Sequence, residues 1–147
     1  MYAAVRVRGQ PDRSNKVDKT IELLGLDNRN KVVFLPETET FEGMLEKVKD
    51  VVTYGQVSED YLEEFLEERT DIDEVFENLD VGSVEELVEK LDEGELNLSD
   101  AVDQGFENLF RLNSPKKGFK DTKRQFKQSG SLGFREGNEI ETLLKRM

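Results

Sequence analysis

The first residues of the chain carry a hydrophobic pattern that is typical of a strand followed by a helix. Apolar and polar residues alternate from residue 2 to residue 8, which predicts a half-buried strand with Arg6 and Arg8 on its polar face. After a short loop, apolar residues recur three or four positions apart. This spacing predicts a helix that is capped by Ser14 or Asn15.

The same two patterns repeat in the next thirty residues. Lys31–Leu35 is rich in β-branched and aromatic residues and predicts a second strand. Helical spacing follows, with Thr38 or Thr40 as the cap. Val51–Tyr54 predicts a third strand that Gly55 ends.

The resulting order of strand, helix, strand, helix, strand predicts an α+β fold for residues 1–54. Both helices can cover one face of a small sheet. The other face would then be open, and Arg6 and Arg8 would point toward that face or toward the loops at its rim.

Residues 55–110 and 111–147 predict two further parts. The first contains amphipathic helices that begin near Ser58, near Ile72 and at Ser83, so it is folded and not a disordered acidic tail. From Arg111 onward the apolar residues thin out. We expect an extended loop over residues 113–137 and then a short last helix.

Charge is sorted into the same three parts. Residues 1–54 hold nine Lys and Arg against nine Asp and Glu, residues 55–110 hold two against twenty, and residues 111–147 hold ten against four, which sums to the net charge of −12. Blocks of one sign create local potentials that select or reject partners. The basic block therefore predicts an anionic partner.

The composition excludes several classes of function. The chain has no cysteine and no histidine, which excludes disulfides, thiolate zinc sites and the usual general base at neutral pH. Catalysis would be left to carboxylates, lysines or hydroxyls, and no paired Asp or Glu stands in a motif that is typical of a catalytic pocket. We therefore expect no catalysis, no cofactor and no small-molecule substrate. No apolar run approaches the roughly 20 residues of a membrane span, so we expect no membrane partner.

Two groups of residues are candidates for binding nucleic acid, because cations neutralise phosphates and aromatic rings stack on unpaired bases. The larger group, which also interleaves with Phe126, is Arg111, Lys116, Lys117, Phe119, Lys120, Lys123, Arg124 and Lys127. The other lies around the first strand, the first loop and the first helix start, and is Arg6, Arg8, Arg13 and Lys16. The alternatives are a solvated basic tail, or one that folds back on the acidic block, and an ordinary exposed helix start.

Several separated motifs resemble the family of large-subunit ribosomal proteins numbered thirty, whose eukaryotic counterpart is numbered seven. In the N-terminal part they are the stretch from Arg8 to Leu26, the turn Leu35-Pro36-Glu37-Thr38 and the run from Gly43 to Val48. In the C-terminal part they are Arg111 to Phe119, Gly130 to Glu136 and the closing Leu-Leu-Lys-Arg-Met, which resemble the archaeal and eukaryotic branch. The resemblance covers residues 2–69 and 109–147.

The resemblance implies a ferredoxin-like, three-stranded antiparallel sheet with two helices on one face. It implies a structural role in the cytoplasm as part of the large ribosomal subunit, with the large-subunit rRNA and neighbouring ribosomal proteins as partners and the 5S rRNA nearby. Family RNA contacts carry over to Arg8, Arg13 and Lys16, and to the basic C-terminal segment, in which we include Arg135. Glu42 and Asp50 depart from the family pattern, which puts a phosphate contact at Glu42 in doubt.

The acidic block has two interpretations. In the first, a salt-loving archaeon keeps cations only where they contact RNA and covers the solvent side with carboxylates. The alternative function belongs to another class, an acidic adaptor whose helical block binds a basic protein partner. Salt-sensitive capture of a basic protein in the absence of RNA would favour the adaptor.

Overall fold

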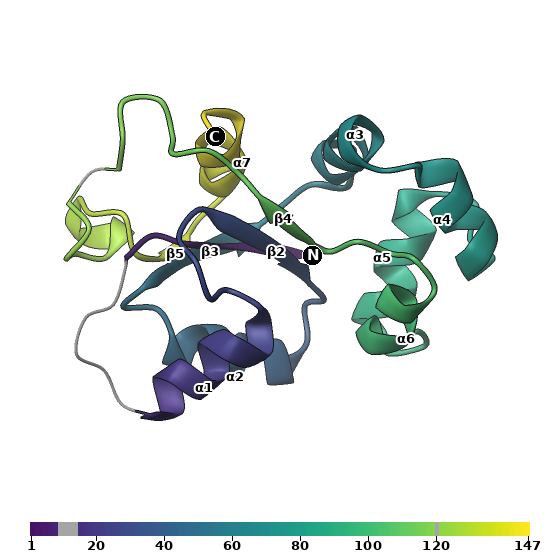
Figure 1. The fold of residues 1–147 in the computed structure, drawn as a ribbon, viewed down its shortest axis with the longest axis horizontal. Coiled ribbons are helices and arrows are strands. Elements are labelled where there is room, and N and C mark those ends of the chain that lie inside the picture. The colour runs from purple at the N-terminus through teal and green to yellow at the C-terminus, as the bar shows by residue number, and fades with distance from the viewer. Residues whose placement is uncertain (9–14, 120) are drawn as a thin grey trace.

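The computed structural model describes residues 1–8, 15–119 and 121–147. A mixed five-stranded sheet with the order β4-β2-β1-β3-β5 lies at its centre (Figure 1). The strands are β1 (Tyr2–Arg6), β2 (Lys31–Leu35), β3 (Val52–Gln56), β4 (Leu109–Arg111) and β5 (Gly133–Arg135). Neighbouring strands are antiparallel, except that β5 runs parallel to β3.

The α+β class is confirmed, whereas the expectation of a sheet with three strands is incomplete. The predicted strands form the centre, and β4 and β5 add one strand to each edge. Strands of three residues are too short to show an alternating pattern in the sequence. They form because the outer strands β2 and β3 would otherwise leave a row of unpaired backbone groups at each edge.

Seven helices surround the sheet in the described part of the chain. They are α1 (Asn15–Leu24), α2 (Glu39–Lys47), α3 (Glu59–Arg69), α4 (Ile72–Leu79), α5 (Val84–Asp92), α6 (Leu98–Asp103) and α7 (Glu139–Lys145). The predicted caps Thr38, Ser58 and Ser83 are confirmed, since each side chain accepts a hydrogen bond from the backbone N–H three residues later. Ser14, one of the two predicted caps of the first helix, lies outside the described residues.

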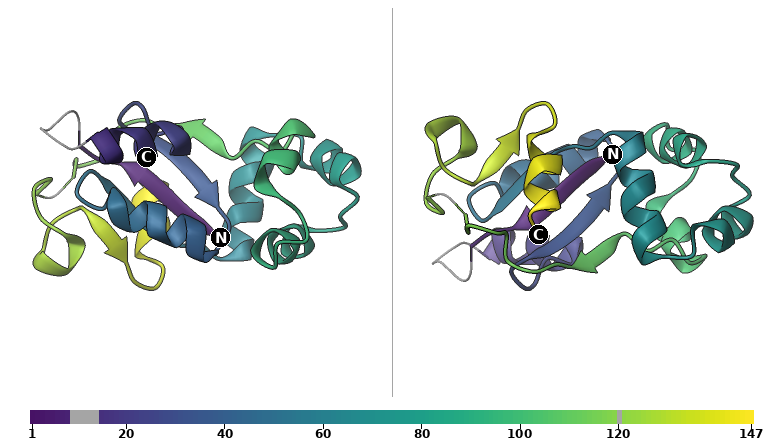
Figure 2. Two further views of the ribbon diagram at one scale, coloured as in Figure 1. Left: turned by 90° about the horizontal axis from the view of Figure 1, so that it is seen from below. Right: turned by 90° about the horizontal axis from the view of Figure 1, so that it is seen from above.

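Alternating side chains of the strands enter two separate cores. Ala4, Val33 and Leu35 pack against α1 and α2, as the pattern predicts. Ala3, Val5 and Phe34 pack on the opposite face against apolar residues of α3, α5 and α7. The expectation of an open face is therefore wrong. Helix α7 lies over this face (Figure 2), and apolar residues of α7 and of the acidic helices form one core with the side chains that the strands direct to it.

Aromatic packing joins the acidic helices to the sheet. The ring of Phe34 lies edge-on to Phe65 of α3 with 5.0 Å between centroids, and Phe65 lies 5.0 Å from Phe110 of β4. Such pairs add to the apolar area that they bury. Helices α3 to α6 therefore contribute apolar residues to the same core as Ala3, Val5 and Phe34, and their carboxylates lie on the outer sides of these helices.

Gly55 lies inside β3 and does not end it. A Cβ atom there would lie 2.8 Å from the carbonyl oxygen of Arg135 and 3.1 Å from the side chain of Ile140. Glycine is therefore needed where β5 and α7 approach β3 closely.

The acidic and basic parts lie at opposite ends of the sheet. Helices α4, α5 and α6 lie together beyond the end at which the N-terminus starts (Figure 2). Residues 121–132, the end of β1 and the start of α1 lie at the other end in both views (Figure 2). Folding therefore turns the sorting of charge along the chain into a separation of charge in space.

Candidate nucleic-acid interface

The candidate interface consists of cationic side chains around the end of the sheet that is remote from α4–α6. Those that are exposed, from the two predicted groups, are Lys16, Arg111, Lys116, Lys117, Lys123, Arg124 and Lys127. Arg8, just beyond β1, is half-buried, and its Nη1 lies 3.5 Å from the carbonyl oxygen of Asp50. Arg13 and Lys120 lie outside the described residues. Folding thus places both predicted groups toward the end of the sheet that is remote from α4–α6, with the start of α1 on one face of the sheet and the segment after β4 on the other (Figure 1).

Hydrogen bonds to the sheet and to α7 hold the start of the basic segment. The backbone N–H of Leu112 donates to the carbonyl oxygen of Asn30 at 2.9 Å, and Asn30 Nδ2 donates to Ser114 Oγ at 3.1 Å. The backbone N–H of Lys116 donates to the carbonyl oxygen of Arg146 at 2.8 Å. These bonds place Lys116 next to the C-terminus of α7.

Gln125 anchors the second half of the basic segment. Its Nε2 donates to the carbonyl oxygen of Lys49 at 3.2 Å and to Asp50 Oδ1 at 3.3 Å. A 3₁₀ turn, η1 (Phe126–Gln128), follows, and the chain then returns as β5. The expectation of an extended loop over residues 113–137 is therefore wrong for these two elements, since tertiary hydrogen bonds give them a regular conformation.

Exposed ion pairs neutralise two of these cations only weakly. Arg124 Nε lies 3.3 Å from Asp121 Oδ2, and Lys127 Nζ lies 3.7 Å from Glu136 Oε1. Exposed pairs of this kind contribute about 0–1 kcal/mol. An anionic partner can therefore displace the carboxylates at little cost.

Arg6 is buried, and its side chain bonds to the backbone of the protein itself. Its side chain is 2% exposed, and Nη1 donates to the carbonyl oxygens of Leu26 and Asp27 at 2.9 and 2.6 Å. Its Nε donates to the carbonyl oxygen of Arg8 at 3.0 Å. The expectation that Arg6 points to an open face is wrong. Its guanidinium instead bonds to carbonyl groups of the loops at the end of the sheet, and that of Leu26 is buried.

Arg135 is buried as well, and it connects β5 to β3. Its Nε donates to Thr53 Oγ1 at 2.8 Å, its Nη2 donates to the carbonyl oxygen of Ser131 at 3.2 Å, and its guanidinium lies 4.6 Å from the ring centre of Phe126. Burial lowers the pKa of Arg135 to about 10, and the nearby charge of Arg146 acts in the same direction.

The two aromatic rings are partly used by the fold. Phe119 packs against the core on the α3 and α7 side of the sheet. Phe126 is half-buried, and the guanidinium of Arg135 covers one side of its ring. The cations of the segment are therefore more available to a partner than its two aromatic rings.

The sequence analysis missed three residues that shape this end of the protein. They are Thr53, Gln125 and Arg146. Thr53 looks like an ordinary β-branched strand residue, and Gln125 carries no charge. Arg146 stands in a short terminal helix whose position over the sheet the sequence does not show. The only sequence signal for Arg146 is its position as a charged residue next to the apolar residues of that helix.

Other kinds of site find no support among the described residues. No group of three or more Asp and Glu is placed to hold a metal ion in residues 1–8, 15–119 and 121–147. Within the same residues, no helix is long and apolar enough to cross a membrane. The fold and the surface define an α+β protein with a cationic end.

Comparison with known proteins identifies the family. The family model for ribosomal protein L30p/L7e matches residues 2–52. The large ribosomal subunit protein uL30 of Methanosphaera stadtmanae is 40% identical over 155 aligned positions, which cover 100% of this chain and 99% of the relative. The uL30 proteins of Nanoarchaeum equitans and Natronomonas pharaonis are each 36% identical, over 99% and 100% of this chain and 97% and 99% of theirs. The chain belongs to the ribosomal protein L30p/L7e family.

Proposed function

We propose that the protein is a structural constituent of the large ribosomal subunit and binds rRNA with the cationic end of its sheet. The observation that carries the proposal is the joining of two separate basic groups at one end, opposite the acidic helices, in a chain similar to uL30 over its whole length. Membership in this family confirms the expectation that the chain is not an enzyme. The cytoplasm, where ribosomes work, is its location.

The mechanism is neutralisation of backbone phosphates by side chains on a preformed support. Each phosphate contact releases counterions, so the binding constant falls with salt at a log–log slope of roughly −0.7 to −0.9 per contact. The seven exposed cations and Arg8 supply these contacts. The carboxylates of α3–α6 repel phosphate, which orients the protein with its acidic end away from RNA.

The three parts of the chain then have different roles. Residues 1–54 form a ferredoxin-like core, residues 55–110 form the acidic helical part, and residues 111–147 supply the rRNA contacts. These parts differ in role and are not separately folded domains, because one hydrophobic core contains residues of all three. We also propose that the 5S rRNA and neighbouring ribosomal proteins lie near the bound protein. No observation favours the acidic adaptor.

Charge removal at the two ends tests the proposal. Lys116→Gln with Lys117→Gln and Arg69→Gln with Lys90→Gln each remove two positive charges, one pair at each end of the molecule. We expect the first double variant to lower the salt slope of rRNA binding by roughly 1.4–1.8 and to weaken co-sedimentation with 50S particles. The second should leave both nearly unchanged. Equal effects of the two would refute the placement of the interface.

A further inference from the structure

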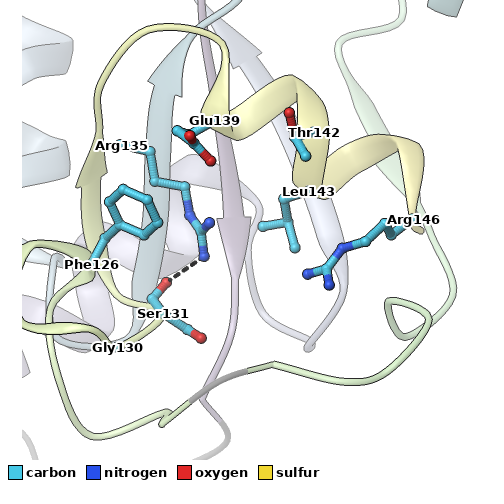
Figure 3. Close-up of a pocket in the computed structure, with 8 residues that line it drawn as sticks. All are labelled: Phe126, Gly130, Ser131, Arg135, Glu139, Thr142, Leu143 and Arg146. Atoms are coloured by element: carbon cyan, nitrogen blue, oxygen red, sulfur yellow. Dashed lines mark hydrogen bonds between the residues drawn. The ribbon is translucent and has the colours of Figure 1, made fainter.

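A pocket of about 200 Å³ lies between η1, β5 and α7. Figure 3 shows the side chains of Arg135 and Arg146 reaching toward the same space from opposite sides. Among the residues that line it are Phe126, Ser131, Arg135, Glu139, Thr142 and Arg146. The pocket therefore combines two guanidinium groups with one carboxylate.

Arg135 carries a charge into this pocket without a carboxylate partner. It is 7% exposed, and its hydrogen bonds use Nε and Nη2, so among the described residues no group accepts a hydrogen bond from Nη1. No carboxylate oxygen of these residues lies within 4.0 Å of its nitrogens, Glu139 included. A buried cation without an ion pair is costly, and the hydrogen bonds and the ring of Phe126 offset only part of that cost.

Arg146 makes the local charge more positive. It follows α7, and it forms no ion pair among the described residues. Burial lowers the pKa of Arg135 most, the carboxylate of Glu139 raises it, and the charge of Arg146 lowers it, so Glu139 offsets part of the repulsion between the two guanidiniums. An anion between the two guanidiniums would relieve this repulsion.

The surroundings of the pocket favour a nucleic-acid anion over an acidic protein segment. Lys116 is joined to Arg146 by a backbone hydrogen bond, and Lys127 lies beside Glu136, the residue after Arg135. Exposed cations thus stand on both sides of the pocket. A chain of regularly spaced phosphates can contact the lysines while one phosphate enters between the two arginines, whose planar groups match phosphate oxygens.

We propose that this pocket binds one backbone phosphate of the rRNA, held by Arg146 and by the Nη1 edge of Arg135. The inference rests on the proposed function, because it names one specific contact within that interface. Glu139 limits the affinity of the pocket, since its carboxylate repels the phosphate. Thr53 and Ser131 position Arg135 without contacting the RNA.

Three variants of the full chain test the proposal with a large-subunit rRNA fragment as the probe. Arg146→Gln should weaken binding roughly tenfold to a hundredfold, which is the range for loss of a charge-assisted hydrogen bond. Lys145→Gln removes the same charge one residue away, on the side of α7 that faces Tyr61, and should change binding less than about threefold. Glu139→Gln should strengthen binding.

Phosphate-ethylation interference then locates the contact. With the natural sequence and with Lys145→Gln, ethylation of one particular phosphate should block binding, and with Arg146→Gln that position should become insensitive. If the natural sequence binds the RNA but Arg146→Gln loses no interference position, the pocket proposal is overturned while the proposed function stands. If the natural sequence does not bind the RNA at all, the proposed function fails.

A free anion is the remaining alternative occupant. Inorganic phosphate should compete with the rRNA fragment more weakly for Arg146→Gln than for the natural sequence if the pocket holds an RNA phosphate. Tight binding of inorganic phosphate with no effect of Arg146→Gln on RNA affinity would contradict the proposal. Arg135→Lys gives a second readout, because it keeps the charge but loses the planar group, and it should weaken RNA binding. It also loses the hydrogen bond from Nε to Thr53 Oγ1, so its binding is compared under conditions in which urea unfolding shows that the variant is folded.

Discussion

Replacing Thr53 by valine should destabilise the protein far more than the same replacement elsewhere. Thr53 is fully buried, and its hydroxyl makes two hydrogen bonds to the C-terminal segment. It donates to the carbonyl oxygen of Gly133 at 2.9 Å and accepts from Arg135 Nε at 2.8 Å. Valine has almost the same shape, so the variant removes the hydrogen bonds and leaves the packing largely intact.

The expected loss follows from the two groups that are left without a partner. A buried polar group without a hydrogen bond costs about 1–3 kcal/mol, with charged groups at the upper end. One charged and one neutral group give a loss of about 2–4 kcal/mol in the free energy of unfolding. For a chain of this length each kcal/mol lowers the melting temperature by roughly 2–4 °C, so we expect a decrease of about 5–15 °C.

Thr20→Val is the matched control. Thr20 is also buried, but its hydroxyl donates only to the carbonyl oxygen of Lys16 in the same helix. This carbonyl group also accepts the backbone hydrogen bond of the helix, so it keeps a partner when the hydroxyl is removed. We expect a change within about 0.5 kcal/mol. Urea unfolding of both variants and of the natural sequence measures the difference. Equal stability of the two variants would refute the argument that Thr53 ties β5 to the sheet.

Two further predictions concern the fold. Gly55→Ala should destabilise the protein by about 1–3 kcal/mol, because its Cβ would press on the backbone of Arg135 and on Ile140, whereas Gly43→Ala in α2, where a Cβ meets nothing within 4 Å, should stabilise it by about 0.4–1 kcal/mol. Urea unfolding measures both changes, and effects of the same sign would contradict the argument that the space around each glycine decides the outcome. Raising KCl from about 0.1 M to 1 M shortens the Debye length from about 10 Å to 3 Å. The repulsion among the twenty carboxylates of residues 55–110 should weaken, so calorimetry should show a higher melting temperature, and a decrease would count against a protein adapted to concentrated salt.

Local patterns in the sequence predicted the central elements of the fold well. The alternation before Arg6, the β-branched run at Lys31–Leu35 and the caps at Ser58 and Ser83 all appear in the structure. These signals are local because a strand alternates every two residues and a cap satisfies N–H groups within one turn. Strands β4 and β5 were not predicted, because each has only three residues and pairs with a strand that is distant in the chain.

The candidate site divides in the same way. The basic composition of residues 111–127 was enough to select the cations that turn out to be exposed, because charged side chains remain at the surface unless they are paired. Burial of Arg6 and Arg135 could not be foreseen. Each lies on a strand where a polar position would normally face solvent, and only the packing of a loop or of α7 removes it from water.

By itself the sequence determined which residues form helices and strands, which carry charge and to which family the motifs belong. Tertiary structure alone decided that the acidic helices complete the second core, that two basic groups meet at one end and that Arg135 and Arg146 share a pocket. The physical reason is that spacing along the chain encodes local faces, whereas proximity between distant segments depends on how those faces pack together.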